Sequence, residues 1–121
     1  MKKSFVLALL VTALFLCCKK DDNKALLLGQ WQGVSWKVRG EESGRNFGAV
    51  RFEFNTDDTY SAAFGDQLER GTFRLSGDKL YTTGENKIEK MVKLSRLSAD
   101  TLVMDMNRVG VSEELVLAKQ H

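Results

Sequence analysis

Short segments in which apolar and polar residues alternate dominate the chain after residue 29. The clearest covers residues 50–55, where Val50, Phe52 and Phe54 share one side and polar residues take the other. This period of two predicts a strand with one buried face. Similar segments, separated by groups of turn-forming residues, predict eight strands at residues 30–39, 50–55, 60–64, 73–75, 79–83, 87–97, 101–106 and 111–119.

The order and spacing of these strands predict an all-β domain. Their short connections favour an antiparallel up-and-down meander, and eight such strands close naturally into a barrel, which removes the unpaired edges of the sheet. A helical domain is disfavoured because no segment keeps an apolar period of 3.6 residues over three turns. Residues 19–24 have the composition of a flexible tether, and residues 25–28 suggest a single helical turn before the first strand.

Two strands break the alternation. In the first, Trp31 has the opposite parity to Val34, Trp36 and Val38, so a bulge or sharp bend is needed between them. In the strand at residues 87–97, Lys90 shares a face with apolar residues. A bulge is the simpler explanation of this position, and an inward Lys90 that contacts an anionic ligand is the alternative.

The first 18 residues have the pattern of an export signal. Lys2 and Lys3 precede a mostly apolar run at residues 5–16, which is too short to span a bilayer because a membrane helix needs about 20 residues. The run fits the apolar core of a secretory signal instead. It ends at Cys17 and Cys18, the only cysteines of the chain, and adjacent cysteines rarely satisfy disulfide geometry.

The segment around Cys18 resembles the lipobox of bacterial lipoproteins, a leucine-rich stretch with a small residue before an acylated cysteine. Cys18 fits this pattern better than Cys17, which follows the bulky Leu16. The alternatives are acylation of Cys17 and an ordinary signal peptide cleaved elsewhere. The resemblance implies a signal peptide at residues 1–17, a lipidated N-terminus and tether at residues 18–25, and a domain at residues 26–121. Diacylglycerol and palmitate on Cys18 would then anchor the protein to a membrane.

Lys20, Asp21 and Asp22 follow the cysteine and resemble the acidic surface-export signal of Bacteroidetes lipoproteins. This resemblance implies an outer-membrane lipoprotein that could face the cell surface, and a solvated tether is the alternative. Lys2 and Lys3 would leave with the signal, so 16 of the 18 basic residues would remain against 16 acidic ones. The mature chain would carry no net charge, and we expect no nucleic-acid partner.

Gly29-Gln30-Trp31, at the start of the first strand, resembles the Gly-x-Trp signature of lipocalins. Residues 52–60, 71–73 and 93–104 look like the small lipocalin-like domain of Bacteroidetes lipoproteins, and the resemblance covers roughly residues 26–118. It implies that Trp31 closes one end of the barrel and that Gly29 permits a tight approach of the chain. In lipocalins a late arginine packs on the closing tryptophan, and Arg108 and Lys119 are the candidate counterparts.

Residue types suited to catalysis or metal binding are scarce. The single histidine is the terminal His121, and no cysteine lies beyond residue 18. The acidic pairs at residues 41–42, 57–58 and 113–114 do not easily form a carboxylate dyad, because adjacent strand residues point to opposite faces. We therefore expect no catalytic residue, no metal site, no cofactor and no enzymatic activity.

Binding is the remaining class of function. An eight-stranded barrel either fills with its own side chains or holds one small ligand. One hypothesis is a binder of a small apolar or amphipathic molecule, and the other is a filled barrel that binds an envelope protein as an inhibitor or accessory subunit. The polar loop at residues 40–48 is a candidate lid or partner contact. The residues expected to line the barrel, or else to form its core, are Trp36, Phe52, Phe54, Tyr60, Phe64, Phe73, Leu102, Met104 and Met106.

Overall fold

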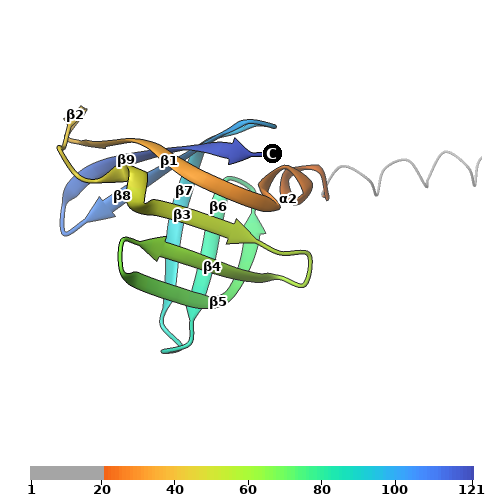
Figure 1. Ribbon diagram of the computed structural model, residues 1–121. Helices are drawn as coiled ribbons and strands as arrows, with labels where there is room; N and C mark the ends of the chain where they lie inside the picture. Colours follow the sequence, from red (N-terminus) through yellow and green to blue (C-terminus); the bar gives the residue numbers. More distant parts are fainter. Residues whose placement is uncertain (1–20) are drawn as a thin grey trace, which may run out of the picture.

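The computed structural model describes residues 21–121 and contains a β-barrel with a short helix at one end (Figure 1). Consecutive antiparallel strands form the wall of the barrel, and β1 pairs with β9 to close it. The predicted eight-stranded up-and-down barrel is confirmed. Its strands are β1 (Gly29–Val38), β3 (Val50–Phe54), β4 (Thr59–Phe64), β5 (Gln67–Ser76), β6 (Lys79–Gly84), β7 (Glu89–Leu97), β8 (Thr101–Arg108) and β9 (Val111–Gln120).

Three further elements lie outside the set of barrel strands. Helix α2 (Asp21–Leu27) precedes β1, the two-residue strand β2 (Glu41–Glu42) pairs with the end of β1, and the 3-10 helix η2 (Phe47–Ala49) leads into β3. The sequence pattern predicted neither β2 nor η2, because both lie in the polar segment between the first two predicted strands.

Strand β1 contains the bulge that the opposite parity of its tryptophans requires. Its pairing with β9 shifts register between Gly33 and Ser35, so that Trp31 and Trp36 are both buried. Val34 is the extra residue and is 45% exposed. The expectation that Val34 shares the inner face with Trp36 is therefore wrong, because the bulge turns Val34 outward.

Strand β7 also has a bulge, but not where the sequence placed it. Its pairing with β6 is regular from Glu89 to Lys93, and the register shift lies further on, between Leu94 and Arg96 on the β8 side. Lys90 consequently keeps the parity of the buried Leu94. The bulge is thus the wrong explanation for Lys90, which lies on the inner face near the end of the barrel.

Helix α2 covers the end of the barrel where β1 begins and β9 ends (Figure 1). Leu27 is fully buried there, and its carbonyl accepts a 2.8 Å hydrogen bond from Nε1 of Trp31. Lys24 forms an ion pair with Asp58 in the turn between β3 and β4. Residues 21–24 belong to this helix, which corrects the prediction that they form a flexible tether.

Lys119, rather than Arg108, is the cation on the barrel-closing tryptophan. Its Nζ lies 4.7 Å from the centre of the Trp31 ring and donates hydrogen bonds to the carbonyl oxygens of Leu26 and Leu28. The lysine therefore ties the end of β9 both to Trp31 and to the end of α2. Gly29 permits this close approach, since it has a φ of 118° and a Cβ there would meet the Lys119 side chain at 2.9 Å.

The core fills the half of the barrel next to α2. Its members are inward residues of successive strands together with Leu27, and they interdigitate around Trp31. This end of the barrel is closed by side chains, so a ligand would have to occupy the other end. The residues of this closed end include Leu27, Trp31, Phe54, Phe73, Leu94, Leu102 and Leu117.

Candidate ligand-binding cavity

A cavity of about 1210 Å³ opens in the half of the barrel away from α2. Its lining includes residues at the far ends of strands, such as Phe64 of β4, Gln67 of β5 and Arg108 of β8. Small-molecule sites usually enclose about 300–1000 Å³, so this cavity has room for a ligand. Its apolar wall includes Trp36, Phe52, Phe64, Leu80, Val92, Met104 and Met106.

Six of the residues expected to line the barrel lie on the cavity wall, namely Trp36, Phe52, Tyr60, Phe64, Met104 and Met106. Phe54, Phe73 and Leu102 do not. They are almost fully buried in the core beneath the cavity, because their places along β3, β5 and β8 are nearer to α2. Alternation identified the inward face of each strand, but it could not distinguish core from cavity along that face.

Aromatic rings stiffen one side of the cavity. Phe64 makes edge-to-face contacts with Trp36 and Phe52, with ring centroids 6.3 and 5.7 Å apart. Phe52 also stacks on Phe54 of the core at 5.8 Å. Because these rings support one another across β1, β3 and β4, the cavity has a largely preformed apolar surface.

Tyr60 supplies a polar atom to this apolar surface. The residue is 2% exposed, and its hydroxyl is the buried side-chain polar atom that finds no hydrogen-bond partner within residues 21–121. Burial, and secondly the negative charge of Glu69, raise the pKa of Tyr60 to about 12. The hydroxyl therefore stays protonated and neutral at physiological pH.

Glu69, Thr82 and Lys90 lie on the same cavity wall as Tyr60. Nζ of Lys90 is 3.3 Å from Oε1 of Glu69, so the two charges offset each other. The inward position of Lys90 agrees with the alternative drawn from sequence, but its partner here is a carboxylate of the protein. Sequence reasoning did not select Glu69 or Thr82, although both have the parity of inward neighbours on β5 and β6.

Glu113 forms a second polar group on β9. Its carboxylate is buried, accepts a 3.0 Å hydrogen bond from Nε1 of Trp36, and lies 3.5 Å from Arg45 and 3.6 Å from Arg108. Both arginine side chains are about half exposed. From sequence, Glu113 was recognised only as one member of an adjacent acidic pair. Its parity with Leu115 and Leu117, which are also buried, could have identified it as inward.

The predicted loop at residues 40–48 lies beside this second group. Arg45 is placed over the Trp36 ring, with its guanidinium carbon 5.2 Å from the ring centre. Ser43 holds the loop to β1, since its hydroxyl donates a 2.6 Å hydrogen bond to the carbonyl of Trp36. The loop thus contacts residues of the cavity wall, which is the position that a lid requires.

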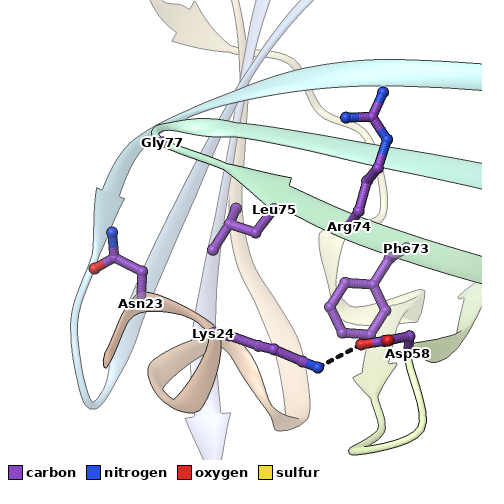
Figure 2. A pocket seen from close by; sticks show the side chains of 7 residues that line it. All are labelled: Asn23, Lys24, Asp58, Phe73, Arg74, Leu75 and Gly77. Carbon is purple, nitrogen blue, oxygen red and sulfur yellow. Dashed lines mark ion pairs between the residues drawn. The ribbon is translucent and has the colours of Figure 1, made fainter. Parts of the chain in front are cut away.

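A smaller hollow of about 280 Å³ lies at the α2 end of the barrel, between α2 and the β5–β6 turn (Figure 2). Lys24 and Asp58 form their ion pair at its edge, and Asn23, Phe73, Arg74, Leu75 and Gly77 complete its lining (Figure 2). Both charged side chains are substantially exposed, so the pair adds little stability. This hollow is the seam along which α2 docks, and it is too small and polar to be the main site.

The predicted export and lipidation residues lie mostly outside the described residues. Cys18 and Lys20 precede residue 21, while Asp21 and Asp22 begin α2. Within residues 21–121, no helix is long and apolar enough to cross a membrane. The same part of the chain contains no cluster of three or more side chains suited to hold a metal ion.

Comparison with protein families gave one match that bears on this geometry. The model of a lipocalin-like domain matches residues 27–104, from the end of α2 into β8. A comparison with curated proteins gave no match.

Solved structures share the barrel at low sequence identity. A lipocalin-like protein from Bacteroides uniformis superposes with a TM-score of 0.63 at 16% identity, covering 78% of this chain and 99% of its own. A duf4847 family protein from Bacteroides vulgatus gives 0.57 at 12% identity, covering 82% and 99%. An uncharacterized protein from Bacteroides eggerthii gives 0.57 at 13%, covering 77% and 98%. At these identities the likeness concerns the fold.

Proposed function

The chain belongs to the family of lipocalin-like domains, and from this premise we propose that its barrel binds one small apolar or amphipathic molecule without catalysis. The single observation that carries the proposal is the cavity of about 1210 Å³ inside the barrel. The fold itself is typical of binding proteins. The cavity adds an apolar wall with a few polar groups, which is the usual composition of a small-molecule site.

The cavity also favours this function over that of a filled barrel which binds an envelope protein. A filled barrel would have side chains packed along its whole length, whereas here the packed core occupies only the half next to α2. Each inner wall of the other half carries residues that a ligand could contact. The inner surface of the half away from α2 is therefore better suited to binding a ligand than to a purely structural role.

We further propose that lipid on Cys18 anchors this barrel to the outer membrane. Two features support an arrangement in which the cavity remains accessible. Helix α2 begins three residues after Cys18 and covers the closed end of the barrel. The cavity opens at the opposite end, so an anchored barrel would present its mouth away from the lipid surface.

Titration with the neutral apolar probe N-phenyl-1-naphthylamine tests the binding proposal. The protein would be residues 21–121, which include the closed barrel, its core and the capping helix. We expect a saturable rise in probe fluorescence with one site per chain. A signal that is absent, or that rises linearly without saturation, would show that the cavity is not a binding site.

A further inference from the structure

The buried Tyr60 hydroxyl finds no hydrogen-bond partner of normal geometry within residues 21–121, although Glu69 and Thr82 are its polar neighbours. An unpartnered buried hydroxyl destabilises a protein by about 1–3 kcal/mol, and most such groups in native proteins have a partner. Phenylalanine would give the same packing against Phe54, whose ring centroid lies 6.4 Å away. The hydroxyl therefore adds nothing visible to the packing, and its position on the cavity wall points to a partner that enters the cavity.

The charges around Tyr60 restrict what that partner can be. Glu69 and Lys90 neutralise each other at 3.3 Å on the same wall. A charged ligand group next to Tyr60 would lose hydration and gain little net attraction, because Glu69 and Lys90 act on it with opposite sign. The arginines near Glu113 lie on the opposite wall and are about half exposed. The group that fits beside Tyr60 is therefore polar but uncharged.

We propose that the Tyr60 hydroxyl recognises an uncharged hydroxyl or carbonyl group on an otherwise apolar ligand. The inference rests on the proposed function, because it names the class of molecule that the cavity takes. A hydroxyl can both donate and accept, so it can bind a ligand carbonyl or a ligand alcohol. Thr82, on the same wall, offers a second hydroxyl within the same cavity.

Displacement of N-phenyl-1-naphthylamine by compounds with a ten-carbon chain tests the head group directly. The competitors are 1-decanol, 2-decanone, decanoate and decyltrimethylammonium, which share an apolar chain and differ in charge. We expect the alcohol and the ketone to displace the probe at concentrations about tenfold lower than the two charged compounds. Decanoate binding as tightly as 1-decanol would overturn the inference and would indicate recognition by the arginines.

Tyr60→Phe tests the residue. We expect about two- to tenfold weaker binding of 1-decanol and 2-decanone, the effect of one hydrogen bond, once the affinity of each variant for the probe has been measured and taken into account. Tyr81→Phe is the matched control, since Tyr81 lies outside the cavity lining and its ring packs against Arg74. Equal losses in both variants, or no loss in either, would overturn the role of Tyr60.

The two proposals fail in different ways. If the probe itself does not bind to the unaltered barrel, the binding function and the inference both fall. If the probe binds but neutral and charged competitors are equivalent, the binding function stands and only the inference falls. The comparison of competitors uses the unaltered protein, so it gives this answer whether or not Tyr60→Phe folds.

Discussion

At the residue scale, the pKa of Tyr60 makes its burial measurable. The folded-state pKa is raised from 10.0 to about 12, so the neutral form is the one that the fold favours. Titration of Tyr60 therefore leaves the stability of the protein unaffected below pH 10 and lowers it as the pH rises toward 12. We expect urea unfolding to show a smaller loss of stability between pH 9 and about 11.5 in Tyr60→Phe than in the unaltered protein. The same loss in both would mean that Tyr60 is not shielded from water.

Tyr60→Phe also separates stability from binding at neutral pH. Removing an unpartnered hydroxyl is expected to leave the free energy of unfolding unchanged or to raise it by up to about 1 kcal/mol. A clear destabilisation of Tyr60→Phe in the absence of ligand would contradict the inference that the hydrogen-bond partner of this hydroxyl is a bound ligand.

Glu113 connects β9 to the loop through Arg45. Glu113→Gln keeps an acceptor for Nε1 of Trp36 but removes the charge that both arginines share. We expect a loss of about 1 kcal/mol in the free energy of unfolding, and faster hydrogen exchange of residues 43–46. Glu114→Gln is the control, because Glu114 is the adjacent residue and none of the ion pairs within residues 21–121 includes it. Unchanged exchange in Glu113→Gln would show that this carboxylate does not hold the loop.

The polar groups of the site were only partly predicted from the sequence. The alternation of apolar and polar residues along β1, β3 and β4 predicts that Trp36, Phe52 and Tyr60 point into the barrel. An inward Lys90 was one of the two alternatives drawn from its parity. Glu69 was not identified, because a charged residue near the end of a strand looks like a solvated one until the neighbouring strands are placed. The 3.3 Å contact between Glu69 and Lys90 joins β5 to β7, and that proximity depends on the closure of the whole barrel.

At the element scale, Gly71 has a specific structural role in β5. A Cβ at this position would overlap the carbonyl oxygen of Thr83 in β6, which is backbone and cannot move aside easily. We expect Gly71→Ala to lower the free energy of unfolding by about 2 kcal/mol or more, measured by urea denaturation. Gly48→Ala is the matched control. A Cβ there meets only the Asn46 side chain at 3.5 Å, so a change within about 0.5 kcal/mol is expected. Similar values for the two variants would contradict the crowded contact between β5 and β6.

The sequence predicted all eight barrel strands but not all their bounds. Strand β5 begins at Gln67, six residues before its predicted start. Leu68 is 74% exposed while Glu69 faces the cavity, so the alternation is reversed there and hides the strand. Pairing of Gln67 with Phe64 orders this segment through the backbone, which hydrophobic patterning does not report.

At the scale of the whole molecule, the family and the barrel could be predicted because the many short strands and the Gly29–Trp31 signature both indicate a lipocalin-like barrel. Whether the barrel is filled could not be predicted, since the same apolar residue types line a core and a cavity. The division arises from where each residue lies along its strand. Phe54 and Phe52 are two positions apart on β3, yet one belongs to the core and the other to the cavity wall.

The anchoring proposal makes a prediction for the intact protein in its host. Cys18→Ser is expected to abolish metabolic labelling by an alkyne analogue of palmitate, whereas Cys17→Ser should retain it. The reason is that acylation requires the cysteine that becomes the first residue after cleavage, which the lipobox resemblance places at residue 18. Labelling that persists in Cys18→Ser and disappears in Cys17→Ser would move the anchor to the neighbouring residue.

The central claim is that one small molecule occupies the barrel, and native mass spectrometry tests it most directly. Residues 21–121 would be produced and exported in the host of this protein, purified without detergent, and transferred intact to the instrument. We predict a population with one small-molecule adduct per chain, which is lost on collisional activation and contains a hydroxyl or carbonyl group. A barrel that carries no small molecule, or that is recovered only with protein partners, would contradict the claim.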